Sequence, residues 1–500
     1  MKGKVYLVGA GPGDYKLLTL KGLECIKEAD VIVYDRLVNK NYLKEVKKEC
    51  ELIYVGKESS NHTLSQENIN KLIANKAKEG KMVTRLKGGD PYVFGRGGEE
   101  GEFLNSEGVE FEVVPGITSA IGGLCYAGIP ITHRDHSSSF HIITGHLRDD
   151  DKKNPEINWN ALSNINGTLV FLMGVSNIKK ISENLIKEGK EKNTPACLIS
   201  FATRYNQKVV TSTLENLYEV SLKENIKSPT LIVIGDVVKL RDKLNFFENK
   251  PLFGKSIIVT RTRCQISSLS SKIYDLGGNA IEIPTIKIEK FKDNKELENE
   301  IKNIKDYNYL ILTSKNAVDI FFDKLDELNL DCRHLSNIKV CAIGQSTEKE
   351  IKKRGIISDI VPKKFASEYL FKELEKVLKP TDKVLIPRAK NARDFLVDNI
   401  NKICEIKEVH TYKTSVDDTK KEEILEMLSL ADYITFSSSS SVTNFVNIIG
   451  KDNLDKLNKI KIISIGEITT NTCNILNVKV YKQATSSTIE SMIDTIIEDK

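Results

Sequence analysis

The stretch Val8-Gly-Ala-Gly-Pro-Gly-Asp14 follows the apolar run Lys4–Val8 and carries three glycines in seven residues. An apolar run that ends in glycines is typical of a β-strand leading into a tight turn. Dinucleotide-binding turns look similar, but Asp14 stands where that motif needs its third glycine, and Pro12 has no N–H to offer a phosphate. The stretch predicts an α/β fold and disfavours a nicotinamide cofactor.

Strand-like and helix-like segments alternate through the first half of the chain, as expected for an α/β protein. Helical periodicity marks Thr19–Lys27 and Gln66–Lys78. The strand-like runs are Lys4–Val8, Val31–Tyr34, Leu52–Val55, Met82–Leu86 and Glu112–Val114, followed by Phe140–Thr144, Thr168–Met173, Ala196–Phe201 and Leu231–Ile234. We expect two lobes, of about residues 1–114 and 115–245, and a short polar connector at 246–253.

The second half contains an internal repeat. Tyr309–Val318 resembles Tyr433–Val442, and Val340–Gly344 resembles Ile462–Gly466. Each pair reads as a strand, a polar turn and the start of a helix, which predicts two doubly wound parallel-sheet domains. The unequal order of the repeated pieces suggests that one domain is about 254–288 plus 414–500, and the other about 289–413.

Composition narrows the class of protein. The 500 residues carry a formal charge of only +5, too mild to indicate a nucleic-acid-binding protein. Nine cysteines are dispersed without a C-x-x-C pair, which argues against a disulfide framework and structural zinc and fits a reducing cytoplasm. The uncharged stretch Val113–Thr132 is broken by glycines and prolines, so we expect a buried loop region rather than a membrane span.

Glycine-rich loops after the predicted strands indicate the class of protein more specifically than composition does. Leu86–Glu100 reads L-K-G-G-D-P-Y-V-F-G-R-G-G-E-E, and such a loop exposes backbone groups without steric cost. V-P-G-I-T-S-A (114–120) begins a helix with hydroxyls at its cap, and G-I-P-I-T-H-R-D (128–135) follows. Together with V-G-A-G-P-G-D and V-Y-D-R-L, these motifs make residues 3–245 resemble uroporphyrinogen-III C-methyltransferases.

The resemblance implies a two-lobed tetrapyrrole methylase fold and transfer of two methyl groups from S-adenosyl-L-methionine to uroporphyrinogen III, giving precorrin-2 for sirohaem or cobalamin synthesis. No metal cofactor is expected. The family's cofactor contacts correspond here to Pro12, Gly88, Gly89, Asp90, Val93, Thr118, Ser119, Met173 and Ala202. At Ala202 the chain has alanine where the family commonly has glycine, so a tight contact there would be lost.

Methyl transfer to a pyrrole carbon mainly requires alignment of the reacting atoms, exclusion of water and removal of a proton. The resemblance implies Asp35 as proton acceptor and Lys57 as proton donor; a strand-end cap and a carboxylate anchor remain the alternatives. Candidate partners for the substrate's carboxylates are Arg36, Arg85, Lys87, Arg96 and Arg134, each of which could equally be a solvated surface charge. Four histidines between 133 and 146 are better explained as polar site or strand residues than as a metal cluster.

The second half is similar to uroporphyrinogen-III synthases, on weaker motifs such as L-T-S-K-N-A-V (312–318), V-H-T-Y-K-T (409–414) and F-S-S-S-S-S-V (436–442). This implies cyclisation of hydroxymethylbilane with inversion of its last ring. The family's candidate acid is Tyr412, for which a packing role is an equal alternative. Expected substrate contacts are Thr313, Ser314, Ser437, Ser438 and Ser439, at strand ends where helix N-termini suit carboxylates.

We therefore expect a bifunctional enzyme that makes uroporphyrinogen III and then methylates it, cytoplasmic and without membrane or nucleic-acid partners. By resemblance, the methyltransferase half should form a homodimer. Two alternatives remain: a methyltransferase of a later precorrin, and a methyltransferase carrying a non-catalytic ligand-binding module in its second half.

Overall fold

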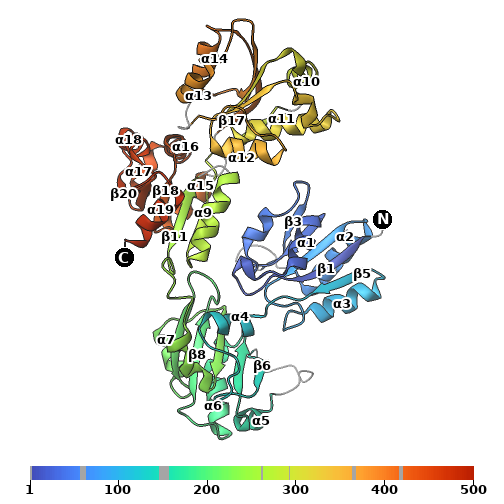
Figure 1. Ribbon diagram of the computed structural model, residues 1–500. Helices are drawn as coiled ribbons and strands as arrows, with labels where there is room; N and C mark the ends of the chain where they lie inside the picture. The colour runs from blue at the N-terminus through green and yellow to red at the C-terminus, as the bar shows by residue number, and fades with distance from the viewer. Residues whose placement is uncertain are drawn as a thin grey trace. The chain divides into compact units, whose positions relative to one another are not determined.

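The computed structural model describes residues 3–56, 64–145, 157–260, 263–285, 287–291, 293–362, 367–415 and 421–499. The chain groups into two compact units, one of Met1–Ile257, Ser270–Ile281 and Ile496–Lys500, the other of Ile258–Leu269 and Glu282–Thr495. Four five-stranded sheets run through these residues (Figure 1). Among the described residues, no helix is long and apolar enough to cross a membrane.

The first sheet is wholly parallel, with the order β3-β2-β4-β1-β5. Its strands are β1 (Lys4–Gly9), β2 (Val31–Tyr34), β3 (Glu51–Tyr54), β4 (Met82–Lys87) and β5 (Glu110–Val114), and its helices are α1 (Leu20–Glu28), α2 (Gln66–Lys78) and α3 (Gly97–Ser106). Alternate side chains of β1 enter two cores. Val5 and Leu7 pack in one, and Val8 packs in the other. Two-sided burial explains the nearly continuous apolar runs of these strands.

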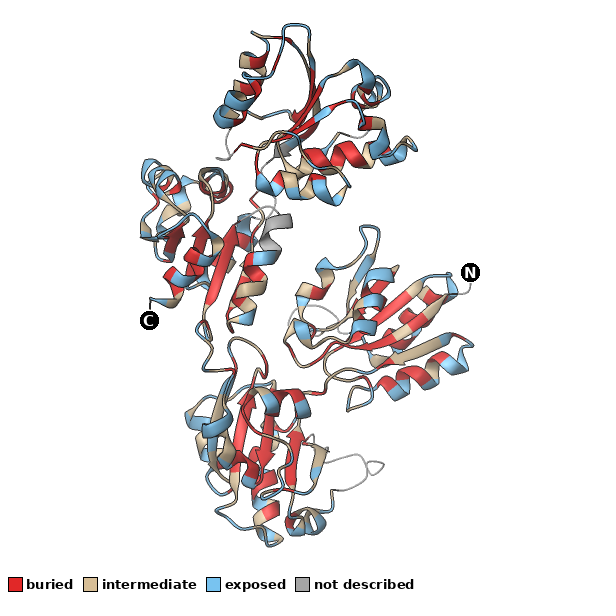
Figure 2. Cartoon of the chain, viewed as in Figure 1, coloured by how far each residue is buried: buried red, intermediate tan, exposed pale blue. Residues whose placement is uncertain are grey.

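The second sheet is mixed, with the order β6-β7-β10-β8-β9, and only its β6–β7 pair is parallel. Its strands are β6 (Phe140–Thr144), β7 (Thr168–Leu172), β8 (Pro195–Ser200), β9 (Lys208–Thr213) and β10 (Thr230–Ile234). The helices of this lobe are α4 (Ser119–Tyr126), α5 (Trp159–Asn164), α6 (Ile178–Lys187), α7 (Leu217–Lys223) and α8 (Arg241–Leu244). Buried residues concentrate along the central strands (Figure 2).

Residues 246–253 pack against the second lobe and form polar contacts with it. Phe247 and Leu252 are buried, and Phe247 packs against Tyr126. Glu248 accepts a hydrogen bond from Gln207 Nε2 at 2.9 Å and pairs with Arg241. This segment is therefore ordered, since its apolar side chains and its carboxylate all have partners.

The third sheet has the order β12-β11-β18-β19-β20 and joins strands that are far apart in the sequence. These are β11 (Ser256–Thr260), β12 (Asn279–Glu282), β18 (Tyr433–Phe436), β19 (Lys461–Ser464) and β20 (Val480–Gln483). The helices that precede or follow these strands in the chain are α9 (Arg263–Asp275), α15 (Lys421–Ser429), α16 (Ser439–Ile449), α17 (Leu454–Leu457), α18 (Glu467–Ile475) and α19 (Ile489–Ile497).

The fourth sheet has the order β13-β17-β16-β14-β15 and is parallel except at its β13 edge. Its elements are β13 (Lys287–Lys290), β14 (Tyr309–Leu312), β15 (Lys339–Ala342), β16 (Lys383–Ala389), β17 (Glu405–Ser415), α10 (Lys295–Lys302), α11 (Lys315–Glu327), α12 (Gln345–Lys353), α13 (Ser367–Leu374) and α14 (Phe395–Ile400). Leu310 and Leu312 face the core with α10, α11 and α12, while Ile311 faces the core with α13 and α14. Helices on both faces make this a doubly wound domain.

Candidate active sites

Two glycine-rich turns meet where the parallel strands β1 and β4 end. The Gly11 and Gly89 backbones exchange hydrogen bonds, with N···O distances of 3.2 and 2.8 Å. A Cβ added to Gly116 would lie 2.6 Å from Gly9 Cα, so the loop after β5 also presses against this point. Glycine is required here because three backbone segments approach one another more closely than any side chain permits.

Asp90 holds these loops in place. Its Oδ1 accepts a hydrogen bond from the Tyr92 N–H at 2.8 Å, and its Oδ2 accepts one from the Gly116 N–H at 3.0 Å. Thr118 then caps α4, with its hydroxyl accepting from the Ala120 N–H. Asp90 therefore shapes the loop through its side chain, a role that the sequence motif alone does not reveal.

The second lobe contributes the loops that follow β7 and β8. Met173, Phe201 and Thr203 all have positive φ angles, of 59°, 48° and 66°. Non-glycine residues adopt this conformation at a cost, and such strain is commonly found at ligand sites. Ala202 lies between two of them, outside the set of residues with positive φ, and its Cβ would be 2.9 Å from a Cβ added to Gly123. The extra methyl group is accommodated because Gly123 leaves room for it.

These loops enclose a cavity of about 350 Å³ between the two lobes of the first compact unit. All nine residues expected to contact the cofactor line it: Pro12, Gly88, Gly89, Asp90, Val93, Thr118, Ser119, Met173 and Ala202. Arg36 and Leu37 also line it, as does Arg204, which sequence reasoning missed. The walls are mainly glycine backbone and apolar side chains such as Phe94 and Phe201, which suits a flat, partly apolar ligand.

Three other predicted residues of this half, Asp35, Arg96 and Arg134, lie outside the cavity lining. Asp35 precedes the lining residue Arg36, and its Oδ1 accepts a hydrogen bond from the Leu37 N–H at 3.0 Å. Arg96 is exposed and forms a two-pronged ion pair with Glu99, and Arg134 is exposed. Lys57 falls outside the residues that the structure describes.

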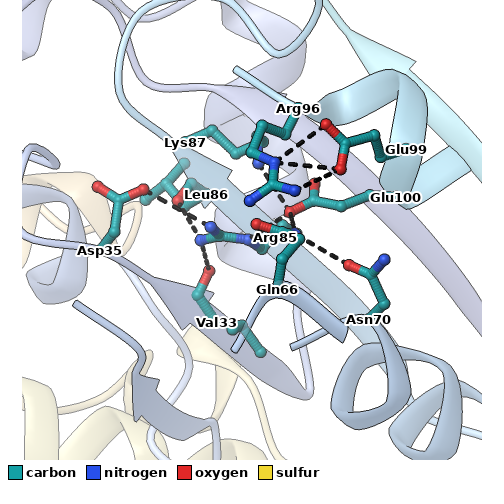
Figure 3. A network of polar contacts seen from close by, with 10 residues as sticks. All are labelled: Val33, Asp35, Gln66, Asn70, Arg85, Leu86, Lys87, Arg96, Glu99 and Glu100. Carbon is teal, nitrogen blue, oxygen red and sulfur yellow. Dashed lines mark hydrogen bonds and ion pairs between the residues drawn. The ribbon is translucent and has the colours of Figure 1, made fainter. Parts of the chain in front are cut away.

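A network of buried charged side chains joins α3 to β4 in the first lobe (Figure 3). Glu100 on α3 is fully buried, and its Oε1 lies 2.7 Å from Lys87 Nζ and 3.3 Å from Arg85 Nε. Arg85 also reaches Asp35, with 3.6 Å between Nη2 and Oδ2. Burial, with the nearby charge of Arg85, lowers the pKa of Lys87, and Glu100 opposes this shift. Arg85 and Lys87 are thus buried and paired, contrary to the expectation that they could bind substrate carboxylates or be solvated.

Sequence reasoning missed Glu100 as part of this network. In the structure, the buried residues of α3 are Gly97, Glu100, Gly101 and Leu104, a helical spacing that places the carboxylate on the inner face. Arg85 and Lys87 are two residues apart on β4, so both point to the same side of the sheet.

In the second half, Tyr412 and Ser314 share a hydrogen bond, with their hydroxyl oxygens 2.9 Å apart. Tyr412 is only 5% exposed and belongs to the core of the fourth sheet, on β17. Ser314 caps α11 by accepting from the Ala317 N–H at 3.1 Å, and Thr313 precedes it at the end of β14. The structure therefore brings the predicted acid next to one of the predicted contact residues.

The predicted serines of the third sheet lie at the corresponding strand end. Ser438 is the N-cap of α16 and forms a capping box with Ser441. The Ser438 hydroxyl is therefore already engaged with the first turn of the helix. Ser439 donates to the Ile468 carbonyl at 3.2 Å. The Ser437 hydroxyl is buried and has no hydrogen-bond partner among the described residues. Of the three, Ser437 is the side chain whose hydrogen-bonding capacity is unused.

Comparison with known proteins identifies both halves. The family described as Tetrapyrrole (Corrin/Porphyrin) Methylases matches residues 4–218, and Uroporphyrinogen-III synthase HemD matches residues 267–494. A Porphyrin biosynthesis protein HemD of Ruminiclostridium josui is 44% identical over 396 residues, which is 79% of this chain and 78% of that protein. A Uroporphyrinogen-III C-methyltransferase of Bacillus subtilis (strain 168) is 42% identical over 355 residues, or 71% of this chain and 72% of that one.

The chain belongs to the uroporphyrinogen-III C-methyltransferase family. It carries a uroporphyrinogen-III synthase domain in its second half and is a bifunctional enzyme of tetrapyrrole biosynthesis. Among solved structures, the uroporphyrin-III C-methyl transferase of Thermus thermophilus complexed with S-adenyl homocysteine is 37% identical, with a TM-score of 0.41, and covers 47% of this chain and 94% of its own. The family assignment confirms the α/β methyltransferase–synthase fusion expected from the motifs.

Proposed function

We propose that the cavity between the two lobes binds S-adenosyl-L-methionine and that the first half uses it to methylate uroporphyrinogen III twice, giving precorrin-2. The observation that carries this proposal is the convergence of nine motif residues, from five separate loops, on one cavity of about 350 Å³. The loops lie far apart in the sequence, and only the fold joins them.

The shape of the cavity fits this cofactor. Gly89 has φ of +71°, and a Cβ built on it would meet nothing closer than 3.9 Å, so a side chain there would occupy cavity space. Backbone at Gly89 can therefore approach a bound adenosine or amino-acid group directly. When bound, the cofactor supplies a methyl group already activated on its sulfonium sulfur.

The protein's own task is to align the substrate carbon, exclude water and accept a proton from it. Asp35 is the proposed acceptor. Its carboxylate accepts a hydrogen bond from the Leu37 N–H and forms an ion pair with Arg85. The Asp35 side chain is 28% exposed to solvent. Lys57 as proton donor and Arg96 and Arg134 as carboxylate partners remain proposals from the family motif. Arg96 and Arg134 lie outside the cavity lining, and Lys57 lies outside the described residues.

The test supplies the intact chain with S-adenosyl-L-methionine and uroporphyrinogen III and follows precorrin-2 by its absorbance. An Asp35→Asn variant should retain cofactor binding, measured by calorimetry with S-adenosylhomocysteine, and lose most of its turnover. Asp242→Asn, a substitution of an exposed carboxylate, is the matched control. Unchanged turnover in Asp35→Asn would remove Asp35 from the mechanism.

For the second half, we infer that it cyclises hydroxymethylbilane to uroporphyrinogen III, with Tyr412 helping the substrate hydroxyl to leave. The pairing of the Tyr412 and Ser314 hydroxyls at 2.9 Å, at the carboxyl end of β14, supports this assignment. Thr313, Ser314 and Ser437 to Ser439 are the proposed substrate contacts.

The synthase assay separates the type III and type I isomers by chromatography. Tyr412→Phe keeps the ring and removes the hydroxyl, and we expect a slower reaction with more type I product. Tyr481→Phe, on the exposed edge of β20, is the control. A Tyr412→Phe rate equal to wild type would leave Tyr412 with a packing role.

Three further expectations remain proposals. We propose a domain boundary within residues 246–253, a homodimer through the methyltransferase half and a cytoplasmic location. All eight cysteines that the structure describes are free thiols, which supports a reducing compartment. Light scattering on residues 1–253 and on the full chain tests the first two, and cell fractionation tests the third.

A further inference from the structure

A second cavity, of about 290 Å³, borders the cofactor cavity within the first compact unit. Its walls come from the turn after β1, the loop after β2, the loop after β8 and residues 274–279. Two residues, Arg36 and Arg204, line both cavities. The two spaces therefore meet at this arginine pair.

The second cavity has an excess of positive charge. Arg36, Lys40 and Arg204 line it, together with a single acidic side chain, Asp14. Asp14 is already engaged, because its Oδ2 accepts from the Tyr126 hydroxyl at 2.9 Å and its Oδ1 accepts from the Lys16 N–H. Among the residues that the structure describes, no carboxylate forms an ion pair with any of the three cations. Clustered like charges repel one another, so this arrangement favours a bound anion.

The local sequence holds Arg204 in this position. Its Nη2 donates to the Leu37 carbonyl at 2.9 Å. A Cβ on Gly13 would lie 2.8 Å from Arg204 Cγ, so the glycine of the β1 turn makes space for this side chain. Thr203, which directly precedes Arg204, has a positive φ angle and accepts a hydrogen bond from the Asp14 N–H at 3.0 Å. Burial and the charge of Arg36 together lower the pKa of Arg204, as expected for a guanidinium without an acidic partner.

We propose that Arg36, Lys40 and Arg204 form a carboxylate-binding subsite, which holds one acidic side arm of the tetrapyrrole while its ring faces the cofactor cavity. The inference rests on the proposed function and adds a location and two residues, Lys40 and Arg204, to it. A cavity of about 290 Å³ is at the small end for organic ligands and suits a side arm rather than the macrocycle. The planar arginine guanidinium can donate two parallel hydrogen bonds to a carboxylate, and the octacarboxylate substrate has carboxylates on all of its pyrrole rings.

The chemistry recognised is a carboxylate, and the methionine part of the cofactor carries one as well. Two measurements on the full chain distinguish these sources: KM for uroporphyrinogen III in the methylation assay, and Kd for S-adenosylhomocysteine by calorimetry. We expect Arg204→Met to raise KM by about tenfold, because a hydrogen bond to a charged group is lost, and to leave Kd within about twofold. A raised Kd with unchanged KM assigns the subsite to the cofactor and overturns the proposal.

Further variants guard against a folding defect at Arg204, which contacts the β1 turn. Lys40→Met alters an exposed side chain in the 3₁₀ helix Lys40–Lys44 and should also raise KM, while Arg204→Lys, which keeps the charge, should recover part of the affinity. Lys48→Met, an exposed lysine outside both cavities, should behave as wild type. If wild type methylates uroporphyrinogen III and the Lys40 and Arg204 variants match it, this inference fails and the proposed function stands. If wild type shows no methylation, the proposed function itself fails.

Discussion

Replacing Glu100 by glutamine would remove the carboxylate that pairs with both Arg85 and Lys87. Glu100 is fully buried, and the side chains of Arg85 and Lys87 are each 5% exposed. The glutamine amide is nearly the same size and can still accept a hydrogen bond from Lys87. The substitution therefore tests charge with little change in packing.

The size of the effect follows from Lys87. Arg85 keeps the Val33 and Leu86 carbonyls and Asp35 as partners, so the uncompensated charge is mainly on the lysine. A lysine with an ordinary pKa of about 10.4 can lose its proton at pH 7 at a cost of about 4.6 kcal/mol, at about 1.36 kcal/mol per pH unit. Because burial already lowers the pKa of Lys87, the cost is smaller. We expect a loss of about 3 to 4 kcal/mol, within the range for breaking a buried pair.

Amide hydrogen exchange of β4 measures this loss without requiring two-state unfolding of a multidomain chain. The expected change is roughly a hundredfold to a thousandfold faster exchange at pH 7. The control is Glu99→Gln on the same helix. Glu99 pairs with Arg96 where both side chains are 54% exposed, so its loss should cost less than about 1 kcal/mol.

The dependence on pH has a definite sign. The folded-state pKa of Lys87 lies below its unfolded value, so between the two the unfolded chain binds more protons and stability rises with pH. Glu100→Gln lowers that folded pKa further, so its deficit should shrink as the pH rises toward 10. The double variant Glu100→Leu/Lys87→Met, which removes both charges, should recover most of the protection. A Glu100→Gln exchange rate within fivefold of wild type, or a deficit independent of pH, would refute this account.

Three further outcomes are expected. Gly116→Ala places a methyl group against backbone and should lower both Tm and affinity for S-adenosylhomocysteine, by calorimetry, with an overpacking cost of about 1 to 3 kcal/mol. The Lys47 ammonium holds the pKa of Asp30 below its ordinary value, so Asp30 stabilises the fold above pH 4 and this is lost as the pH falls below that. Asp30→Asn should therefore flatten the acid limb of a pH–Tm curve. Burial raises the pKa of Cys197 to about 12, so the exposed Cys125 should react much faster with a thiol reagent, as mass spectrometry would show.

Much of the fold follows directly from the sequence. Val31–Tyr34 and Phe140–Thr144 coincide with observed strands, because these apolar runs are bounded by aspartate or glycine. Gln66–Lys78 coincides with a helix, because Ser65 caps its start and Gly80 follows its end. The nine expected cofactor contacts were inferred from the resemblance of contiguous motifs to a known family, and the structure places all nine around one cavity.

Contacts between residues far apart in the chain could not be predicted from the sequence motifs. The Glu100 network depends on which face of α3 meets β4, and the motif letters R-G-G-E-E do not separate Glu99, which is exposed, from Glu100, which is buried. Arg204 comes next to Gly13 only when the two lobes meet, so no local pattern indicates its role. Periodicity specifies faces of elements, while the partners across a cavity are decided by tertiary packing.

The contact between Ala202 and Gly123 couples two positions that are 79 places apart in the chain. A Cβ on Gly123 would meet Leu231 Cδ1 at 2.7 Å as well as the Ala202 Cβ at 2.9 Å, so glycine in place of Ala202 relieves one of the two close contacts and the Leu231 side chain must turn to relieve the other. Alanine in place of Gly123 should therefore cost less when Ala202 is replaced by glycine than when it is kept, and the two positions should tend to vary together among relatives.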